Sequence, residues 1–339
     1  MTAAKMCFDK ILPADLNRPM RMMMIGGRMQ AVFEFRKRWI NGSTLTVRFI
    51  GGTPEQQAQV MQEAALWTEH ANLNFDFNDA PDADIRISFD PTDGAWSYVG
   101  TDARGIPQSQ ATMNLGFMDG GTSIHEFGHA IGLGHEHQNP DGGMQWNEAE
   151  VISDLSGPPN NWSEAQIRHN VLRRYSDDQI RGTEFDPDSI MLYAFPSRWT
   201  LNGVATHGNS DLSDLDKAFI RGAEAYPGRG QPAVGGVELD VIDTSGVVAN
   251  IGAAGEEDLF TFNVDKQGRH VIETSGSTDV VMKLFGPDSQ TSLIAEDDDG
   301  GTGRNSRIAA DLLLGKYFVQ IRHFNQSAST GDYQIRVTS

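Results

Sequence analysis

The chain has little cysteine, little positive charge and no long apolar run. Among its 339 residues there is one cysteine, Cys7, which excludes any disulfide bond within the chain. Lysine and arginine number 27 against 46 aspartate and glutamate residues, and the net charge of −19 argues against nucleic acid and anionic membrane surfaces as partners. No segment is apolar enough to span a membrane, and the longest apolar run near the start, residues 22–25, is too short for the core of a signal peptide.

The length and the composition indicate a loop-rich globular protein of two domains. A chain of 339 residues exceeds one average domain, and 39% hydrophobic residues with 36 glycines and 14 prolines are typical of such a fold. Residues 1–40 differ from the rest, because they hold eight basic and three acidic residues and show no sustained period. We expect this segment to be an extended or partly ordered lead-in, similar to a pro-segment.

The most informative motif lies at residues 125–135. His125 and His129 are spaced by one helical turn, so a helix places both imidazoles on one face, where they can bind one metal ion. Glu126 follows the first histidine directly and can accept a proton from a metal-bound water. An amphipathic helix with surface histidines is the alternative, against which the specificity of the whole motif argues.

Gly132 and His135 complete the motif. Gly132 can end the helix in a left-handed turn, which would return the chain and present His135 as the third ligand. Three histidines leave a fourth position for water or substrate, which a catalytic zinc needs and a closed structural zinc lacks. The sequence therefore predicts a hydrolytic zinc site.

The motif resembles that of the metzincin metallopeptidases, His-Glu-x-x-His-x-x-Gly-x-x-His. Glu136, directly after the third histidine, is similar to the residue that astacins carry there. Residues 189–193 resemble the methionine turn of these enzymes, in which Met191 would be an apolar floor beneath the histidines. Tyr193 follows the methionine by two residues, as in the astacin form of the turn, where a tyrosine faces the metal.

This resemblance implies an astacin-like, zinc-dependent endopeptidase. One catalytic Zn²⁺ would be held by His125, His129 and His135. Glu126 would act as the general base toward a metal-activated water, and Tyr193 would help to stabilise the oxyanion of the transition state. The absence of disulfides departs from most animal astacins and favours a bacterial-type enzyme.

The same resemblance implies that residues 41–227 form an α+β metzincin catalytic domain, with a twisted mixed sheet, helices and a zinc cleft. Local patterns predict its helices at the zinc motif, at 162–175 and at 212–220, and its strands at 44–50, 84–89, 94–100 and 111–116. Thr53, Pro54 and Gln56 predict the capped start of a further helix, with Val60, Ala64, Trp67 and Ala71 on its buried face.

The resemblance also makes the strand at 111–116 the sheet edge along which a peptide substrate would lie antiparallel. A plain edge strand without a substrate role is the alternative. We expect Trp146, Trp162 and Trp199 to pack the part of the domain that follows the zinc motif.

Residues 228–236 are rich in glycine and predict a linker. Beyond it, residues 237–339 alternate with a period of two between turns, which predicts an all-β sandwich domain. This stretch resembles the bacterial pre-peptidase C-terminal (PPC) domain, which accompanies secreted proteases and has no catalytic residues. The matching features are residues 258–260, 277–279, 297–301 and 331–333.

Two weaker signals stay open at this point. Asp297, Asp298 and Asp299 could bind Ca²⁺ in the C-terminal domain, or could simply form a solvated acidic turn. Cys7 or Asp9 could block the zinc site from the lead-in, as pro-segment residues do in other metzincins. His137 lies close enough to the third histidine to tune the site but is not counted as a ligand.

We expect a secreted, monomeric protein that acts on protein or peptide substrates, with neither nucleic acid nor membrane as partner. One alternative is a secreted protease toxin with a narrow host target, whose chemistry would be the same. The other is a binding or adhesive module with a vestigial zinc domain, against which the intact Glu126 argues.

Overall fold

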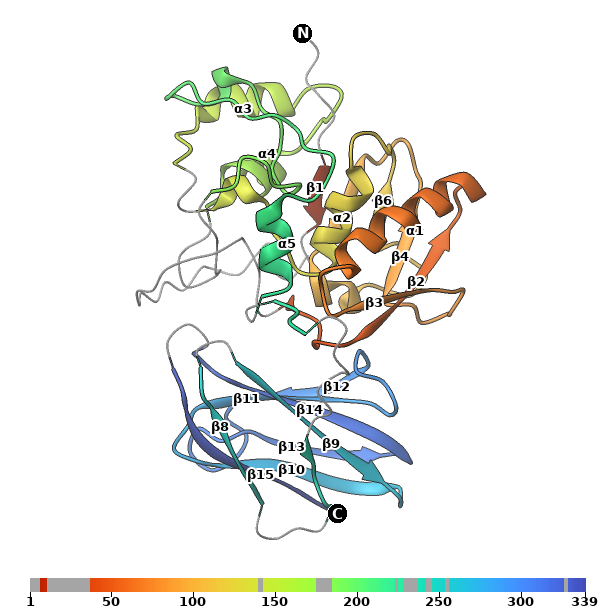
Figure 1. Cartoon of the computed structure of the whole chain (residues 1–339), viewed down its shortest axis with the longest axis vertical. Helices are drawn as coiled ribbons and strands as arrows, with labels where there is room; N and C mark the ends of the chain where they lie inside the picture. The colour runs from red at the N-terminus through yellow and green to blue at the C-terminus, as the bar shows by residue number, and fades with distance from the viewer. Residues whose placement is uncertain are drawn as a thin grey trace. The chain divides into compact units, whose positions relative to one another are not determined.

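The computed structural model describes residues 7–10, 37–139, 143–174, 185–222, 225–228, 237–241, 246–253, 256–325 and 329–339 (Figure 1). The chain divides into two compact units, Met1–Arg229 and Gly230–Ser339. The predicted linker, except for Gly228, lies outside the described residues, as does most of the predicted lead-in.

The first unit is built on a six-stranded mixed sheet in the order β1-β5-β6-β4-β2-β3. Strands β2, β3, β4 and β6 run parallel to one another, whereas β5 is antiparallel to β6 and β1 is parallel to β5. The strand bounds are β1 Cys7–Lys10, β2 Thr44–Ile50, β3 Asn74–Phe77, β4 Ile85–Ser88, β5 Ala95–Tyr98 and β6 Met113–Leu115. The predicted mixed sheet is confirmed, although β1 and β3 have no clear signal in the sequence.

The prediction that residues 111–116 form the sheet edge is wrong. Strand β6 lies between β5 and β4, with a pairing partner on each side. On that side of the sheet, β5 is the outermost strand apart from β1, which pairs along it from Cys7 to Lys10. A local pattern reveals a strand but not its neighbours, and the neighbours decide which backbone groups stay available.

Helix α1, Pro54–Thr68, begins at the predicted capping box. The Thr53 side chain accepts a hydrogen bond from the Gln56 amide, and the Gln56 side chain accepts one from the Thr53 amide. The predicted apolar face is buried, and the indole of Trp67 donates a 2.7 Å hydrogen bond to the carbonyl of Ile124 in α2, Thr122–Ala130. This contact joins the two helices, which pack together against the sheet (Figure 1).

The end of α2 is held by two buried aromatic side chains from distant parts of the unit. The indole of Trp39 donates to the carbonyl of Ala130 at 2.8 Å, and the hydroxyl of Tyr226 donates to the carbonyl of Ile131 at 2.7 Å. Helix carbonyls in the last turn have no partner within the helix, so these bonds satisfy groups whose burial would otherwise be costly.

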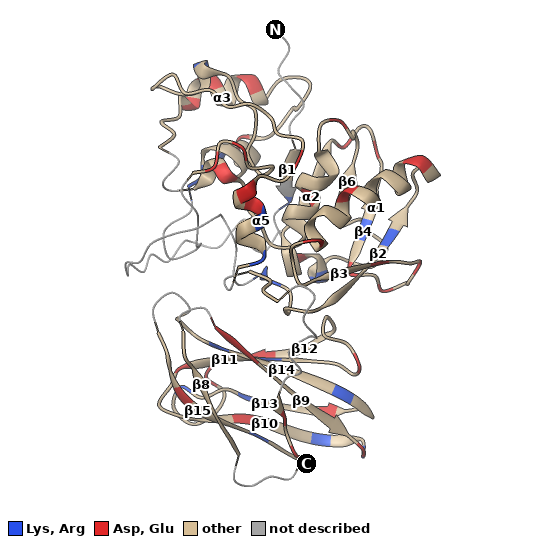
Figure 2. Ribbon diagram, in the orientation of Figure 1, with Lys and Arg blue, Asp and Glu red and all other residues tan. Residues whose placement is uncertain are grey.

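The remaining helices of this unit are short: α3 Glu148–Leu155, α4 Glu164–Ile167, and α5 Asp214–Ile220, with a π-helical turn at Arg168–Leu172 and 3₁₀ turns at Gly100–Gly105, Glu136–Gln138 and Ser197–Trp199. The helix predicted at 162–175 begins at α4, which Ser163 caps, and its described helical turns end at Leu172, whereas α3 is absent from the sequence-based prediction. Trp162 and Trp199 belong to the core of this part, and Trp146 packs against it. Acidic residues occur in both α3 and α5, where the ribbon is red in Figure 2.

The described residues of the second unit contain strands and no helix. A four-stranded sheet has the order β13-β10-β15-β8, and a five-stranded sheet has the order β12-β11-β14-β9-β7. Phe262, Ile272 and Ile335, which come from both sheets, belong to one hydrophobic core. The bounds are β7 Val237–Glu238, β8 Val247–Ile251, β9 Glu257–Val264, β10 Gly268–Gly276, β11 Val280–Phe285, β12 Leu293–Asp297, β13 Arg307–Leu312, β14 Gly315–His323 and β15 Gly331–Thr338.

Candidate metal centre

Helix α2 presents His125, Glu126 and His129 inside the first unit. All three side chains are buried, and the two imidazole rings lie with their centroids 4.8 Å apart. The helix can approach its surroundings closely because residue 128 is glycine, where a Cβ would clash with the sulfur of Met191. The methionine of the predicted turn thus lies directly against the helix that carries the histidines.

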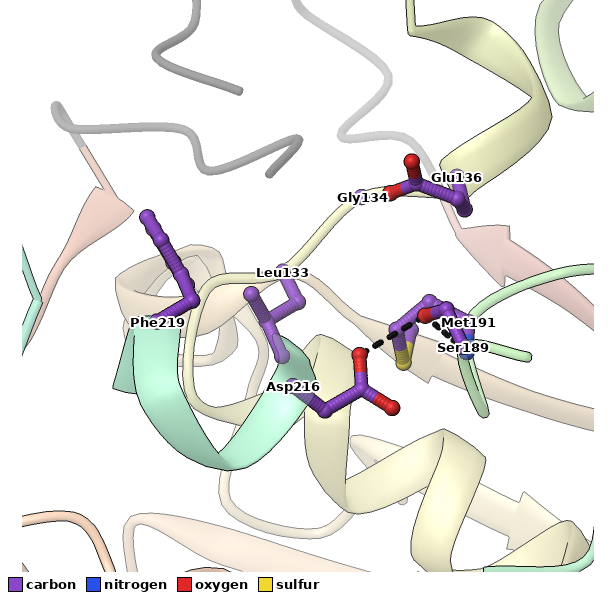
Figure 3. A pocket seen from close by; sticks show the side chains of 7 residues that line it. All are labelled: Leu133, Gly134, Glu136, Ser189, Met191, Asp216 and Phe219. Carbon is purple, nitrogen blue, oxygen red and sulfur yellow. Dashed lines mark hydrogen bonds between the residues drawn. The ribbon is translucent and has the colours of Figure 1, made fainter. Parts of the chain in front are cut away.

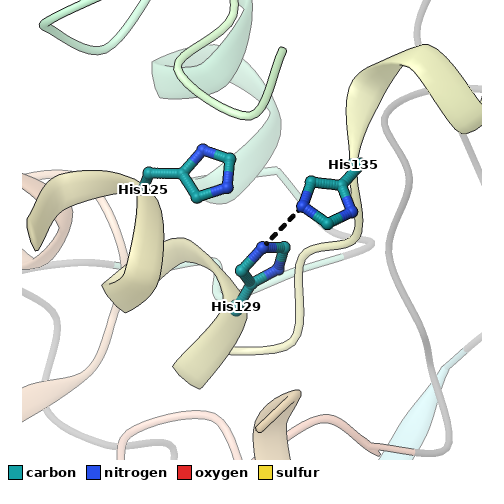
Figure 4. A group of neighbouring side chains, drawn as sticks. All are labelled: His125, His129 and His135. Atoms are coloured by element: carbon teal, nitrogen blue, oxygen red, sulfur yellow. Dashed lines mark hydrogen bonds between the residues drawn. The ribbon is translucent and has the colours of Figure 1, made fainter. Parts of the chain in front are cut away.

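A left-handed turn brings the third histidine back to this helix. Gly132 has φ of +109°, its amide donates to His129 O at 2.8 Å, and the amide of Leu133 donates to Gly128 O at 2.9 Å. These two bonds are those of a Schellman motif, as expected for Gly132. The chain then returns so that Nε2 of His135 lies 3.0 Å from Nε2 of His129 (Figure 4).

The hydrogen bonds of the imidazoles determine whether this group can hold a metal. Nδ1 of His125 lies 2.7 Å from the carbonyl of Ile190, and Nδ1 of His129 lies 2.8 Å from the carbonyl of Leu133. A carbonyl only accepts, so each Nδ1 must carry the proton, and each Nε2 then keeps its lone pair for a metal.

The spacing of the ligand atoms fits one zinc ion. One ligand nitrogen from each of His125, His129 and His135 lies within 4.8 Å of the others. The 3.0 Å between the two Nε2 atoms is close to the separation of about 3.4 Å that two nitrogens have on one tetrahedral zinc. Three imidazoles in a buried site are a donor set that suits zinc.

Tyr193 packs among the histidines. Its ring centroid lies 4.2 Å from that of His135, 4.9 Å from that of His137 and 5.7 Å from that of His125. Its hydroxyl donates a hydrogen bond to the backbone carbonyl of Cys7 in β1. The tyrosine therefore points its polar end at a peptide carbonyl that lies beside the predicted ligands.

His137 packs against the rings of His135 and Tyr193. It is buried, its Nε2 lies 2.9 Å from the carbonyl of Asn170, and its ring stacks on those of His135 and Tyr193. It does not belong to the metal-ligating groups found among the described residues. The stacking has no signal in the sequence, because it depends on Tyr193 from a distant turn.

Strand β1 brings Cys7 to the same place. A ligand atom from each of Cys7, His125 and Glu126 lies within 4.8 Å of the others. Burial raises the pKa of the Cys7 thiol well above its ordinary value, and the neighbouring Glu126 carboxylate raises it further. The side chain of Asp9, the other residue considered as a plug, lies outside the described residues.

The strand is also held by the side chains of two residues that follow Cys7. Phe8 is buried with its ring 5.6 Å from that of Trp162, in an edge-to-face contact. Lys10 places its ammonium 3.3 Å from the ring centroid of Trp96 and 3.6 Å from the carboxylate of Asp93. These side-chain contacts add to the backbone pairing of β1 with β5. Together they fix the position of the strand, and with it that of Cys7 beside His125 and Glu126.

Glu136 directly follows His135, and its amide donates a hydrogen bond to the carbonyl of Met191 in the methionine turn at 3.0 Å. Burial raises its pKa to about 8, against hydrogen bonds from the Asp186 amide and the Asn139 side chain, which lower it. It borders a cavity of about 10 Å³, roughly the size of one water molecule (Figure 3). The cavity is lined by Leu133, Gly134, Glu136, Ser189, Met191, Asp216 and Phe219.

The C-terminal aspartates do not form a comparable group. Within the described part of the chain, three or more potential ligands come together only in the two groups given above. Asp297 instead accepts hydrogen bonds from the amides of Gly300 at 2.8 Å and Arg307 at 2.7 Å. The arrangement is that of an acidic turn, and it gives the alternative of a Ca²⁺ site no support.

Comparison with known proteins agrees with this site. The sequence model of the peptidase family described as Astacin matches residues 32–212, which is more than half of the chain. The chain belongs to the astacin family. Astacins are zinc-dependent peptidases, and the match includes the three histidines, Glu126 and the methionine turn.

Individual relatives cover smaller parts. Astacin-like metalloprotease toxin 1 of Loxosceles intermedia is 30% identical over 155 residues, 46% of this chain and 53% of that protein. Blastula protease 10 of Paracentrotus lividus is 44% identical over 110 residues, 32% of this chain and 16% of that protein. The chain thus spans about half or less of the length of these relatives.

Among solved structures, that of myroilysin is 38% identical and superposes with a TM-score of 0.53, covering 56% of this chain and 96% of that one. The likeness supports the astacin-like metzincin fold of the first unit. None of the helices in the described residues has both the length and the apolar character that a membrane span requires.

The geometry predicts one zinc ion per chain. His129→Gln removes the central nitrogen, so elemental analysis of the purified variant should find the bound zinc largely lost, while the wild type holds about one equivalent until a chelator removes it. His207→Gln is the matched control, because that imidazole is exposed and outside the group. Equal zinc contents in the two variants would contradict the assignment.

Proposed function

We propose that this astacin-family chain is a zinc-dependent endopeptidase. The observation that carries the proposal is the buried group of three imidazoles, two of which have Nδ1 fixed by backbone carbonyls, next to Glu126. When bound, Zn²⁺ supplies a Lewis acid that polarises a water molecule and a scissile carbonyl. The binding-module alternative would have no need for a carboxylate at Glu126.

The protein side chains supply proton transfer and charge stabilisation. Glu126 accepts the proton of the attacking water and passes it to the amine that leaves. Tyr193 donates a hydrogen bond to the oxygen on which negative charge develops. Its hydroxyl already donates to the carbonyl of Cys7, so it is within reach of a peptide backbone that runs past the histidines.

We further propose that peptide substrates bind along β5 rather than β6. Strand β1 pairs with β5. Once β1 has moved away, the backbone N–H and C=O groups of β5 that face β1 would form hydrogen bonds with an extended substrate. Substrates would be proteins or peptides in the extracellular space, bound by a monomer. The occurrence of a toxin among the relatives keeps a narrow host target open as the alternative.

We propose four segments: a pro-segment-like region at residues 1–40, a catalytic domain at 41–227, a linker at 228–236 and a PPC-like β-sandwich at 237–339. Two sheets around one core support the last assignment. Three observations support the pro-segment-like role of residues 1–40. Strand β1 pairs along β5, Cys7 lies beside Glu126, and the hydroxyl of Tyr193 donates a hydrogen bond to the Cys7 carbonyl. A thiolate is also a good zinc ligand. The strand would therefore keep the enzyme latent.

Glu126→Gln should separate metal binding from turnover. The three imidazoles are untouched, so the variant should retain its zinc, whereas kcat for peptide cleavage should fall by about 10²–10⁴-fold because the general base is lost. Glu148→Gln, an exposed position, is the control. Wild-type turnover by Glu126→Gln would refute the assigned base.

Tyr193→Phe should test the oxyanion donor alone, since the ring and its packing are kept. We expect kcat to fall by about 10²–10³-fold, with KM and zinc content nearly unchanged, because the hydrogen bond to the oxyanion forms only in the transition state. The comparison should be made in chains lacking β1, so that the contact to Cys7 does not contribute. An unchanged kcat would make Tyr193 structural.

Removal of residues 1–10 should activate the enzyme. Without β1, the β5 edge, Glu126 and Tyr193 become accessible, and we expect the initial rate of peptide cleavage to rise at least about tenfold. Cys7→Ser should raise the rate less, because the strand pairing and the contacts of Phe8 and Lys10 remain. If the shortened and full chains cleave at the same rate, β1 is not inhibitory.

A further inference from the structure

A carboxylate outside the zinc motif is tied to the first predicted ligand. We propose that Asp216 of α5 is a positioning residue for the metal site, because it fixes the backbone of Ile190 and, through it, the ring of His125. The inference rests on the proposed zinc site and adds to it a residue far away in the sequence.

Both oxygens of Asp216 hold the methionine turn. Oδ2 accepts a hydrogen bond from the amide of Ile190 at 2.9 Å, and Oδ1 accepts one from the hydroxyl of Ser189 at 2.7 Å (Figure 3). The same hydroxyl accepts a hydrogen bond from the amide of Met191 at 3.1 Å. Three consecutive residues of the turn are thus held directly or indirectly by one side chain.

Ile190 connects this anchor to the metal site. Its amide is bound by Asp216, and its carbonyl lies 2.7 Å from Nδ1 of His125. Both backbone polar groups of Ile190 are therefore hydrogen-bonded. Its carbonyl cannot shift without loss of the bond to His125 or of the bond to Asp216. The partner of the second ring nitrogen fixes the tautomer and orientation of a ligating histidine, so the position of this carbonyl matters for metal affinity.

Asp216 is itself fixed by the first turn of α5. Its amide donates to the hydroxyl of Ser213 at 2.9 Å, and its Oδ2 accepts from the Ser213 amide at 3.0 Å, as in a capping box. Ser213 also donates to Asp186 at 2.6 Å. A simpler role for Asp216 would be to cap α5 only, and the experiment must separate the two roles.

Asp216→Asn is the test, since the amide keeps the shape but leaves one acceptor oxygen in place of two for the Ser189 hydroxyl and the amides of Ile190 and Ser213. Zinc dissociation constants are measured by competition with a chromogenic chelator, and thermal unfolding is recorded on the metal-free protein. We expect zinc binding about tenfold weaker or more, and an altered absorption spectrum after substitution with Co²⁺.

Ser213→Ala is the matched control, because it removes the cap of α5 but keeps the bonds from Asp216 to the methionine turn. It should lower the unfolding temperature and leave the zinc dissociation constant and the Co²⁺ spectrum unchanged. An Asp216→Asn protein that binds zinc like the wild type overturns the inference. So does an equal loss of affinity in both variants, which would reduce Asp216 to a helix cap.

Two further outcomes are distinguishable. If the wild type itself binds no zinc, the proposed function fails, independently of Asp216. If Asp216→Asn does not fold, Ser189→Ala takes its place, because it removes one of the donors to Asp216 and the acceptor of Met191. Zinc binding by Ser189→Ala should weaken severalfold, and wild-type affinity in that variant overturns the inference.

Discussion

The candidate site depends on two hydrogen bonds between imidazole Nδ1 atoms and backbone carbonyls. Ile190 O binds His125 and Leu133 O binds His129, and each bond directs the opposite ring nitrogen toward a common point. The two carbonyls come from turns rather than from regular structure. The fold of the first unit therefore has to place two turns against one helix.

Each of the two turns is fixed by a different means. The turn after α2 is determined locally, because Gly132 adopts a positive φ and two backbone bonds close it. The methionine turn is held by distant groups: the Asp216 carboxylate at Ile190, and the amide of Glu136, which donates to Met191 O at 3.0 Å. The first turn can be predicted from the sequence for this reason, whereas the supports of the second cannot.

The same distinction explains which parts of the fold the sequence predicts. The capping boxes at Thr53 and Ser163 join residues three positions apart, so their side chains determine them locally. Strand order is not local, which is why the prediction of an edge strand at 111–116 fails. Strand β1 lies in a segment without a period, and it forms because β5 offers backbone partners and because Trp162 and Trp96 contact its side chains. Only this pairing places the cysteine beside Glu126.

The most direct test of the account is a zinc titration of the metal-free chain lacking residues 1–10, with cleavage of a denatured protein as the readout. If the three histidines hold one catalytic zinc, no cleavage occurs without metal, and the rate rises linearly with added Zn²⁺ and levels off at one equivalent. Cleavage that persists in excess chelator, or no cleavage at any zinc concentration, would contradict it.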